Sequence, residues 1–447
     1  MRNYLFILFG LLCATLVAQV QNTQPLLLPA GSSLQASSLT TYELDSAFVY
    51  QKVDSIVTTG IKNNAFPGAQ VLIAKEGNII FHEAYGFHTY DSIQPVAEND
   101  IYDLASVTKI LGPLPAIMKL VDEGKLNLDL PFSTYWKPWK SHKDKATITL
   151  REILAHQAGL EPYIVFLNKT LKNNGRFKKR FVRIKPNRRF NNEAYEGIYV
   201  KNRFNHKMYR IINRSKVSAE KKYKYSGLTF LIFPELISQI TGVPYDEYME
   251  QKFYKPLGMK TFGFLPSTKN FSNKIVPTET DTIYRHTLTQ GWVHDENASL
   301  LGGISGNAGL FGTADDLAII MQMFMQNGHY AGKQYISENT IKEFTKVQYA
   351  DNDNRRGLGF DKPYLENNTF KIADAYPAPE VGASSFGHSG FTGSFVWADP
   401  ENKLVYIFLS NRVYPTRENR NIYKLNIRSS IQQIFYQAFD NAKQHQP

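Results

Sequence analysis

Strand patterns occur at both ends of the chain, and helical patterns fill the region between them. Near the amino end, residues 69–74 and 79–84 predict a β-hairpin. Near the carboxyl end, residues 393–398 and 404–410 predict two strands joined by a turn-forming run, Asp399-Pro400-Glu401-Asn402. This order favours one antiparallel sheet that is built from both termini and flanked by helices, with a helical insertion in the middle. The predicted fold class is α+β.

Helical spacing of apolar residues recurs in six segments. A capping box, Thr149 and Glu152, marks the start of one of them. Although 447 residues would correspond to about three domains of ordinary size, a single sheet with a helical insertion accounts for this length. We therefore predict one domain, residues 46–447. The six segments are residues 48–61, 106–121, a helix that starts at Thr149, and residues 227–240, 315–325 and 426–442.

The amino terminus has the features of a secretory signal peptide: a short positive start, an apolar stretch too short to span a bilayer, and small residues after it. We predict a signal peptide at residues 1–18, a tether at residues 19–45 and a secreted or periplasmic mature protein. Cys13, the only cysteine, follows Leu12 rather than the small residue of a lipoprotein signal. It would leave with the signal peptide, which excludes disulfides, cysteine catalysis and thiolate metal sites.

Positive charge is concentrated in one segment, the basic insertion, at about residues 161–224. The whole chain has 51 basic and 40 acidic residues, a net charge of +11. From residue 161 to 225, 19 Lys or Arg stand against four acidic residues, whereas the remainder has 32 against 36. Two interpretations stay open: a solvated, partly ordered surface excursion, or a cationic lid that attracts anionic cell-wall fragments or contacts an anionic envelope. We expect no nucleic acid partner for an exported protein.

Ser106-Val107-Thr108-Lys109 opens one of the predicted helices. Residues three apart share a helix face, so the Lys109 amine can reach the Ser106 hydroxyl. A serine hydroxyl becomes a good nucleophile when a base removes its proton, and the positive end of a helix favours an oxyanion. A second sequence of this type, Ser218-Ala219-Glu220-Lys221, has no apolar helix behind it. We therefore favour Ser106.

Two further short motifs precede regular elements. Tyr225-Ser226-Gly227 comes before an apolar helix, where a tyrosine can take the serine proton and return it to a leaving group. His388-Ser389-Gly390 comes just before a predicted strand, and its glycine lets an extended acyl chain approach the strand edge. Taken singly, such a tyrosine is more often a core aromatic, and such a histidine is usually structural.

Together and in this order, the three motifs resemble those of the serine β-lactamase and penicillin-binding protein superfamily, in its class C and DD-carboxypeptidase-like branch. The similarity runs from about Ser46 to the carboxyl end. It implies an antiparallel sheet flanked by helices and a mostly helical subdomain, with the site between them. It implies no cofactor, and the histidines show no metal-ligand spacing. Further matching stretches are Phe66-Pro67-Gly68-Ala69, Leu104-Ala105-Ser106, Leu154-Ala155-His156-Gln157-Ala158-Gly159-Leu160, Pro256-Leu257-Gly258-Met259, Gly291-Trp292-Val293-His294-Asp295 and Gly302-Gly303-Ile304-Ser305-Gly306-Asn307-Ala308-Gly309-Leu310-Phe311.

The resemblance also implies a role for each motif residue. Ser106 is the expected nucleophile, Lys109 its proton partner and Tyr225 a second acid/base. His388-Ser389-Gly390 occupies the place of the family's Lys-Thr-Gly-type strand motif, whose first residue helps to bind a substrate carboxylate and orders the tyrosine. The backbone N–H groups of Ser106 and Phe391 are expected to form the oxyanion hole.

Two positions depart from the family pattern. Gly227 stands where Asn, Asp or Ser is usual, which removes a side chain expected to hold the acylamide group of a penicillin or peptide. His388 stands where lysine is usual. Both departures favour a general ester or amide hydrolase over a true β-lactamase.

Four residues near the motifs have weaker signals. His294 and Asp295 recur in a narrower subset of the family and are candidate site neighbours, with loop packing as the alternative. We expect His156 to cap or pack the helix that it ends. Asn307, in a glycine-rich loop, is expected to be structural.

These patterns favour an exported serine acyl hydrolase that works through an acyl-enzyme. D-Ala-D-Ala carboxypeptidase and carboxylesterase activities are equally favoured, and β-lactamase activity is a weaker alternative. Two alternatives come from other classes: a non-catalytic sensor of penicillins or wall fragments, and an envelope-binding adhesin that acts through the basic insertion. The patterns predict no oligomeric state.

Overall fold

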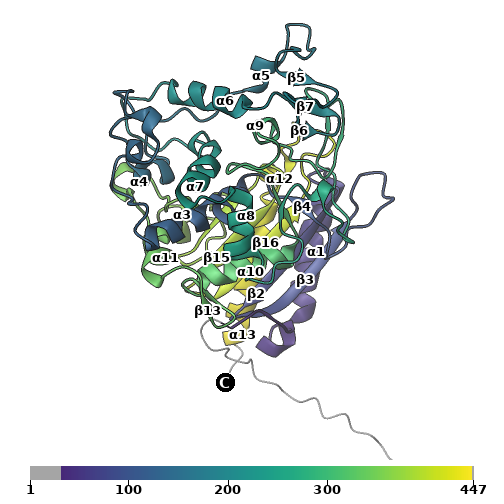
Figure 1. Cartoon of the computed structure of the whole chain (residues 1–447). Helices are drawn as coiled ribbons and strands as arrows, with labels where there is room; N and C mark the ends of the chain where they lie inside the picture. The colour runs from purple at the N-terminus through teal and green to yellow at the C-terminus, as the bar shows by residue number, and fades with distance from the viewer. Residues whose placement is uncertain (1–31, 445–447) are drawn as a thin grey trace, which may run out of the picture.

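A six-stranded sheet lies at the centre of the computed structural model, which describes residues 32–444 (Figure 1). The predicted signal peptide and residues 19–31 of the predicted tether lie outside the described residues. Neighbouring strands are antiparallel except β1, which pairs with β3 in parallel. Both ends of the chain therefore build one sheet, as predicted. The strand order is β1 (Gln35–Ala36), β3 (Asn78–Gly86), β2 (Gly68–Lys75), β16 (Leu404–Ser410), β15 (Phe395–Asp399) and β14 (Phe386–Ser389).

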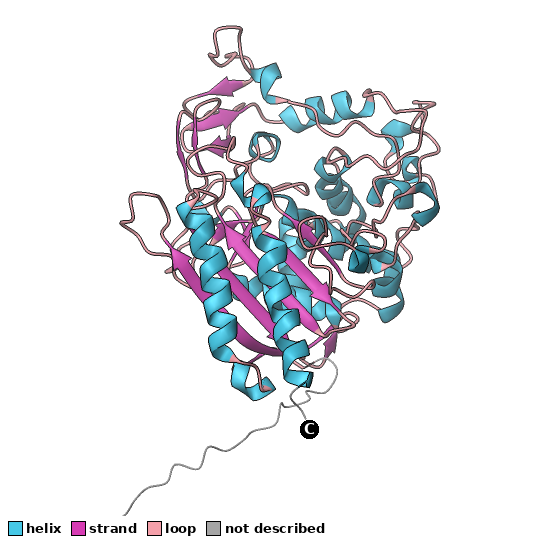
Figure 2. Cartoon of the chain, turned by 180° about the vertical axis from the view of Figure 1, so that it is seen from behind, coloured by secondary structure: helices cyan, strands magenta, loops and turns pink. Residues whose placement is uncertain are grey.

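Helices cover both faces of the sheet. Figure 2 shows the long helices α1 (Ser46–Lys62) and α13 (Ile427–Gln444) side by side on one face, and Figure 1 shows α10 (Ala314–Met325) on the other. Every residue of β16 is buried, because alternate side chains enter separate apolar cores on the two faces. The result is the α+β arrangement that the sequence predicts.

The first described residues join this sheet instead of forming a tether. Gln35 and Ala36 pair with Asn78 and Ile79 of β3. Leu39, in the short 3-10 helix that follows, is only 3% exposed, and Leu44 is 4% exposed. The prediction of a tether to residue 45 is therefore wrong for the described part of this segment. Buried apolar side chains anchor the segment to the fold, and their spacing has neither helical nor strand periodicity.

Two predicted helices are broken near their starts. The helix predicted at residues 106–121 is α2 (Thr108–Leu111) followed by α3 (Pro113–Asp122). The break falls at Gly112, because Pro113 has no N–H and restricts the residue before it. The helix predicted at residues 227–240 starts as a 3-10 turn and becomes α7 (Phe233–Thr241). The predicted capping box is present at the start of α4 (Leu150–Leu154).

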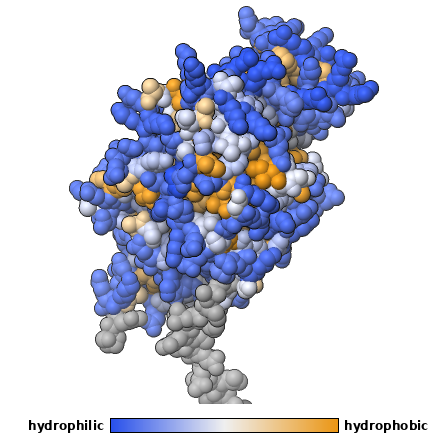
Figure 3. All heavy atoms as spheres, turned by 60° about the vertical axis from the view of Figure 1, so that its left-hand side comes forward, coloured by the Kyte–Doolittle hydropathy of each residue, from blue (hydrophilic) through white to orange (hydrophobic). Residues whose placement is uncertain are grey.

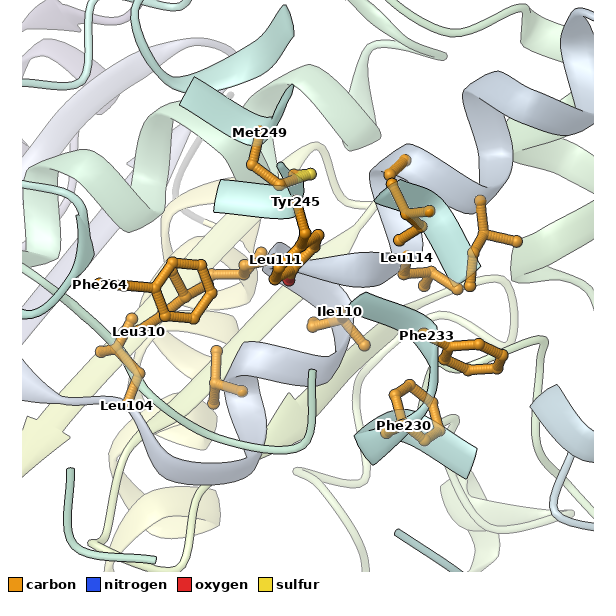
Figure 4. Close-up of a cluster of buried hydrophobic side chains, with 14 of the residues drawn as sticks. Leu104, Ile110, Leu111, Leu114, Phe230, Phe233, Tyr245, Met249, Phe264 and Leu310 are labelled. Carbon is orange, nitrogen blue, oxygen red and sulfur yellow. The ribbon is translucent and has the colours of Figure 1, made fainter. Parts of the chain in front are cut away.

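The helical region packs its apolar side chains against α2, the short helix that follows Ser106. Figure 4 shows Ile110 and Leu111 of α2 among aromatic and aliphatic side chains from α7, α8 (Tyr245–Met249), β8 (Gly263–Phe264) and β11 (Leu310–Gly312). This packing fixes the segment that carries Ser106. The remaining helices and strands outside the basic insertion are β4 (Tyr102–Asp103), β9 (Glu279–Asp281), β10 (Thr287–Thr289), α9 (Glu296–Leu300), β12 (His329–Tyr330), β13 (Lys333–Gln334), α11 (Glu338–Thr345) and α12 (Asn421–Lys424).

The basic insertion is folded and forms the upper part of the molecule in Figure 1. Phe204, Met208 and Ile212 are buried in the main core, whereas most of its lysines and arginines are exposed. The part that projects in Figure 3 is mostly hydrophilic, with a small apolar patch. The insertion is therefore not the partly ordered excursion of the first interpretation. Its elements are α5 (Leu167–Thr170), β5 (Val182–Arg183), β6 (Asn192–Tyr195), β7 (Ile198–Val200) and α6 (Phe204–Asn213).

Between residues 32 and 444, we find no helix with the length and apolar character that crossing a membrane requires.

Candidate active site

Ser106 lies on a sharp turn between β4 and α2. The preceding residue, Ala105, has a φ of 45°, a left-handed conformation that is costly for a residue with a side chain. Asp103, at the end of β4, holds the turn because its carboxylate accepts the Ala105 N–H at 2.8 Å. The flanking residues are buried and Ser106 is partly exposed. The turn therefore presents the hydroxyl of Ser106 while its backbone stays fixed.

The Lys109 amine contacts the Ser106 hydroxyl, as the spacing of the motif predicts. Nζ donates to Ser106 Oγ at 2.8 Å and to the backbone carbonyl of Asn307 at 2.9 Å. Lys109 is only 3% exposed. Asn307 was expected to be structural, but its carbonyl directly holds the amine in place, so that expectation is incomplete.

Asp295 supports this contact through Asn307. Its Oδ1 accepts from Asn307 Nδ2 at 3.0 Å and also from the Ala298 N–H at 2.8 Å, which caps the start of α9. Asp295 therefore acts through Asn307, whose carbonyl contacts Lys109. This makes it a positioning residue.

Asp295→Ser should lower kcat by about tenfold or more with little change in stability, because serine caps a helix but is too short to reach Asn307. Asp295→Ala should lose the cap as well, at a cost of about 1 kcal/mol. Steady-state kinetics and urea unfolding of both variants check this. If Asp295→Ser keeps full kcat, the link from Asp295 through Asn307 has no role in activity.

Tyr225 and His388 meet beside Lys109. The Tyr225 hydroxyl lies 3.5 Å from His388 Nε2, and Lys109 Nζ lies 5.4 Å from the centre of the Tyr225 ring. His388 Nδ1 lies 2.7 Å from the carbonyl of Ser389, so Nδ1 is the donor. Burial, together with nearby Arg356 and Lys109, lowers the pKa of His388 to about 3. A neutral His388 can therefore accept a hydrogen bond from the Tyr225 hydroxyl through Nε2.

This shift makes stability depend on pH. Between pH 6.5 and about 3, the unfolded chain binds a proton at position 388 and the folded protein does not, so stability falls as the pH falls through this window. At pH 4 the loss should be about 3 kcal/mol relative to pH 7. His388→Gln should remove this part of the loss. Urea unfolding at pH 7 and pH 4 measures the free energy of unfolding of both proteins. If His388→Gln loses as much stability between pH 7 and pH 4 as the unmodified protein does, the assignment to His388 is wrong.

His156 is not only a helix-end residue, as was expected, but also contacts the tyrosine motif. Its Nδ1 accepts the N–H of Ser226 at 3.2 Å, and its ring centre lies 4.5 Å from that of Tyr225. Burial lowers the pKa of His156 well below its usual range.

Gly227, the third residue of the tyrosine motif, borders open space, because an added Cβ would meet only Lys109 Cε, at 3.9 Å. The side chain missing at position 227 therefore leaves room beside Lys109.

Arg356 also belongs to this site, although no sequence motif marks it. Its guanidinium lies 5.6 Å from the centre of the Tyr225 ring and is buried. Asp361 pairs with Arg356 at 3.1 Å and with Arg355 at 3.0 Å, so two arginines share one carboxylate. Two cations, Arg356 and Lys109, thus lie close to the Tyr225 ring.

The strand motif is fastened to the turn that carries Ser106. Ser394 Oγ donates to the carbonyl of Leu104 at 3.0 Å. A side chain at Gly390 would place its Cβ 2.6 Å from the same carbonyl, so only glycine fits there. This contact joins the segment that contains Phe391 to the residues immediately before Ser106.

His294 packs against the ring of Phe391. Its N–H donates to Asp103 at 2.7 Å, its Nε2 lies 2.8 Å from Glu279 Oε2, and its ring stacks on Phe391 with 5.8 Å between the centres. The guanidinium of Arg412 lies 4.3 Å from the centre of the Phe391 ring. His294 therefore positions Phe391 and the Ser106 turn.

The second Ser-x-x-Lys sequence lies apart from this cluster. Ser218 is exposed in a loop. Its lysine, Lys221, is paired with Glu152 of the capping box. The structure thus separates the two motifs in the way that the apolar context predicts.

Comparisons with known proteins agree with this geometry. The family model described as Beta-lactamase matches residues 53–428. A protein of Escherichia coli O157:H7 named as a D-alanyl-D-alanine carboxypeptidase is 28% identical, over 80% of this chain and 82% of its own length. An N-acetylmuramyl-L-alanine amidase of Bacillus subtilis (strain 168) is 28% identical, over 84% of each chain. The solved structure of EstCE1, a hydrolase with promiscuous acyltransferase activity, aligns with a TM-score of 0.61 and 17% identity, over 86% of this chain and 98% of its own.

Proposed function

The chain belongs to the beta-lactamase family of serine hydrolases, and from this we propose that it hydrolyses an amide bond of bacterial cell-wall fragments, as a D-alanyl-D-alanine carboxypeptidase does. The observation that carries the proposal is the 2.8 Å contact between Lys109 Nζ and Ser106 Oγ on a strained, partly exposed turn. Both relatives reported above are named for reactions on wall amides, which supports this substrate class over a simple ester.

In the proposed reaction, Ser106 Oγ forms a bond to the carbonyl carbon and its proton passes to the Lys109–Tyr225 pair. The oxyanion is stabilised by the backbone N–H groups of Ser106 and Phe391. The carbon–nitrogen bond then breaks, and the leaving amine takes the proton back. Water repeats these steps on the acyl-enzyme and releases the acid.

The edge of the sheet supports binding of an extended substrate. β14 is the last strand of the sheet, and Asp361 pairs with Gly387 on its outer side. Ser389 and Gly390 follow this bridge, so an acyl chain can align beside them as an added strand. The neutral His388 acts on the substrate indirectly, because its hydrogen bond orients Tyr225.

Wall fragments are outside the cytoplasm, so the proposal includes export through the predicted signal peptide, residues 1–18. The exposed charges of the basic insertion support contact with an anionic envelope. Co-sedimentation with purified walls at low and high salt tests this contact, which should weaken as salt rises.

A substrate panel followed by intact-mass measurement tests the function. The panel contains a D-Ala-D-Ala peptide, nitrocefin and a short-chain aryl ester. Release of D-alanine with a transient adduct supports the proposal, whereas turnover of the ester alone or of nitrocefin alone indicates an esterase or a β-lactamase. An adduct that never clears indicates a sensor, and the proposal is then wrong.

A further inference from the structure

A cavity of about 570 Å³ lies beside the candidate active site, on the side of Tyr223. This volume falls within the range of small-molecule sites, about 300–1,000 Å³. Its lining combines apolar rings, one aliphatic side chain and two carboxylates: Tyr223, Tyr364, Leu365, Phe370, Asp353 and Asp374.

Exposed apolar side chains are concentrated here. Tyr223, Tyr364, Leu365 and Phe370 are each 40–43% exposed, although large apolar side chains normally avoid water. Clusters of this kind in soluble proteins mark interaction surfaces, ligand-binding grooves among them. Tyr364 and Phe370 meet edge to face at 84°, with 6.3 Å between their centres, so their rings form two walls of a corner.

Two residues that line the cavity are close in sequence to residues of the catalytic cluster. Tyr223 precedes Tyr225 by two positions, and the charges of Arg356 and Asp361 act on its phenol. Arg355 lines the cavity and precedes Arg356, which lies over Tyr225. A ligand in the cavity can therefore belong to a substrate whose reacting bond is at Ser106.

The carboxylates of the lining oppose an anionic ligand and favour a ligand with hydrogen-bond donors. Asp353 and Asp374 are exposed on the lining and repel an anion. Arg355 also lines the cavity, but its charge is balanced by Asp361 at 3.0 Å. A ligand with one apolar face and several hydroxyl or amide N–H donors fits both the aromatic rings and the carboxylates, and N-acetylated pyranose sugars have this character.

We propose that this cavity binds an N-acetylated sugar of the cell-wall fragment that the enzyme cleaves. The C–H face of the pyranose ring packs on the rings of Tyr364 and Phe370. Its hydroxyl and acetamide N–H groups donate to the carboxylates of Asp353 and Asp374. The proposal rests on the proposed function only for the identity of the substrate, since binding of the sugar needs no catalysis.

Titration of N,N′-diacetylchitobiose into the Ser106→Ala protein, followed by calorimetry, tests the site without turnover. We expect saturable binding that Phe370→Ala and Tyr364→Ala each weaken by about tenfold or more. Phe370→Trp should keep the affinity, because it keeps an aromatic face. Tyr50→Ala is the matched control: Tyr50 is 40% exposed on α1, away from the cavity, and should have no effect.

The proposal would be overturned if the Ser106→Ala protein did not bind the disaccharide. It would also be overturned if adding Phe370→Ala or Tyr364→Ala left the affinity unchanged. Preference of the cavity for L-lysyl-D-alanyl-D-alanine over the disaccharide would overturn it too, in favour of a peptide site. The two proposals fail separately. Sugar binding without hydrolysis of any wall amide contradicts only the proposed function, and hydrolysis without sugar binding contradicts only the sugar site.

Discussion

Replacing Ser106 with alanine should lower kcat/KM by about 10⁴-fold or more and abolish covalent labelling by a fluorophosphonate probe. The reason is local: Ser106 provides the hydroxyl that Lys109 contacts at 2.8 Å, and it is the only partly exposed group of a buried turn. The fold should persist, because removing one partly exposed hydroxyl leaves the bond from Ala105 to Asp103 intact. Hydrolysis rates on the best substrate of the panel and the extent of labelling measure the effect.

Ser218→Ala is the matched control, because Ser218 begins a motif of the same spacing. Ser218 is exposed and its motif lysine is paired elsewhere, so this variant should keep full activity and labelling. Loss of activity in Ser218→Ala together with retention in Ser106→Ala would move the nucleophile to the other motif. Equal, weak labelling of the unmodified protein and Ser106→Ala would contradict a serine nucleophile altogether.

The sheet could be predicted from the sequence because its signals are local. A hairpin at each end and strong helical spacing in residues 48–61 and 426–442 were enough to predict two helices over a sheet built from both termini. The helix breaks at Gly112 and before Phe233 were missed, since apolar spacing continues across both. The sheet strand at Gln35 was missed because it is two residues long and is stabilised by contacts with β3.

In the candidate site too, residues in local motifs could be predicted, and residues that act through contacts between distant segments could not. Ser106, Lys109, Tyr225 and His388 belong to short motifs, and the structure brings these four together. The contact of Asn307 with Lys109 has no sequence signal, because any residue has a backbone carbonyl. Arg356 could not be found for another reason: it lies in no motif, and only the three-dimensional arrangement shows that it faces Tyr225.

Arg356→Gln should lower kcat by about 10²-fold with a smaller change in KM. To accept the serine proton in the proposed reaction, Tyr225 must act as a negatively charged phenolate, and Arg356 is a buried cation 5.6 Å from its ring centre that stabilises this charge. His388, which replaces the usual motif lysine, is neutral because its pKa is about 3, so it supplies no charge. A unit charge at this distance is worth about 3 kcal/mol at an effective dielectric constant of about 20, which corresponds to about 10²-fold in rate.

Arg355→Gln is the control that separates this electrostatic effect from loss of structure. Both arginines pair with Asp361, so either variant leaves the carboxylate with one partner. Only Arg356 lies over Tyr225, so only Arg356→Gln should lose kcat, and Arg356→Lys should restore most of it by returning a positive charge. Thermal unfolding confirms that all three variants are folded before their kinetics are compared. Equal kcat values for Arg355→Gln and Arg356→Gln would show that the pair only supports the fold, and the positive charge at Tyr225 would then have to come from Lys109 alone.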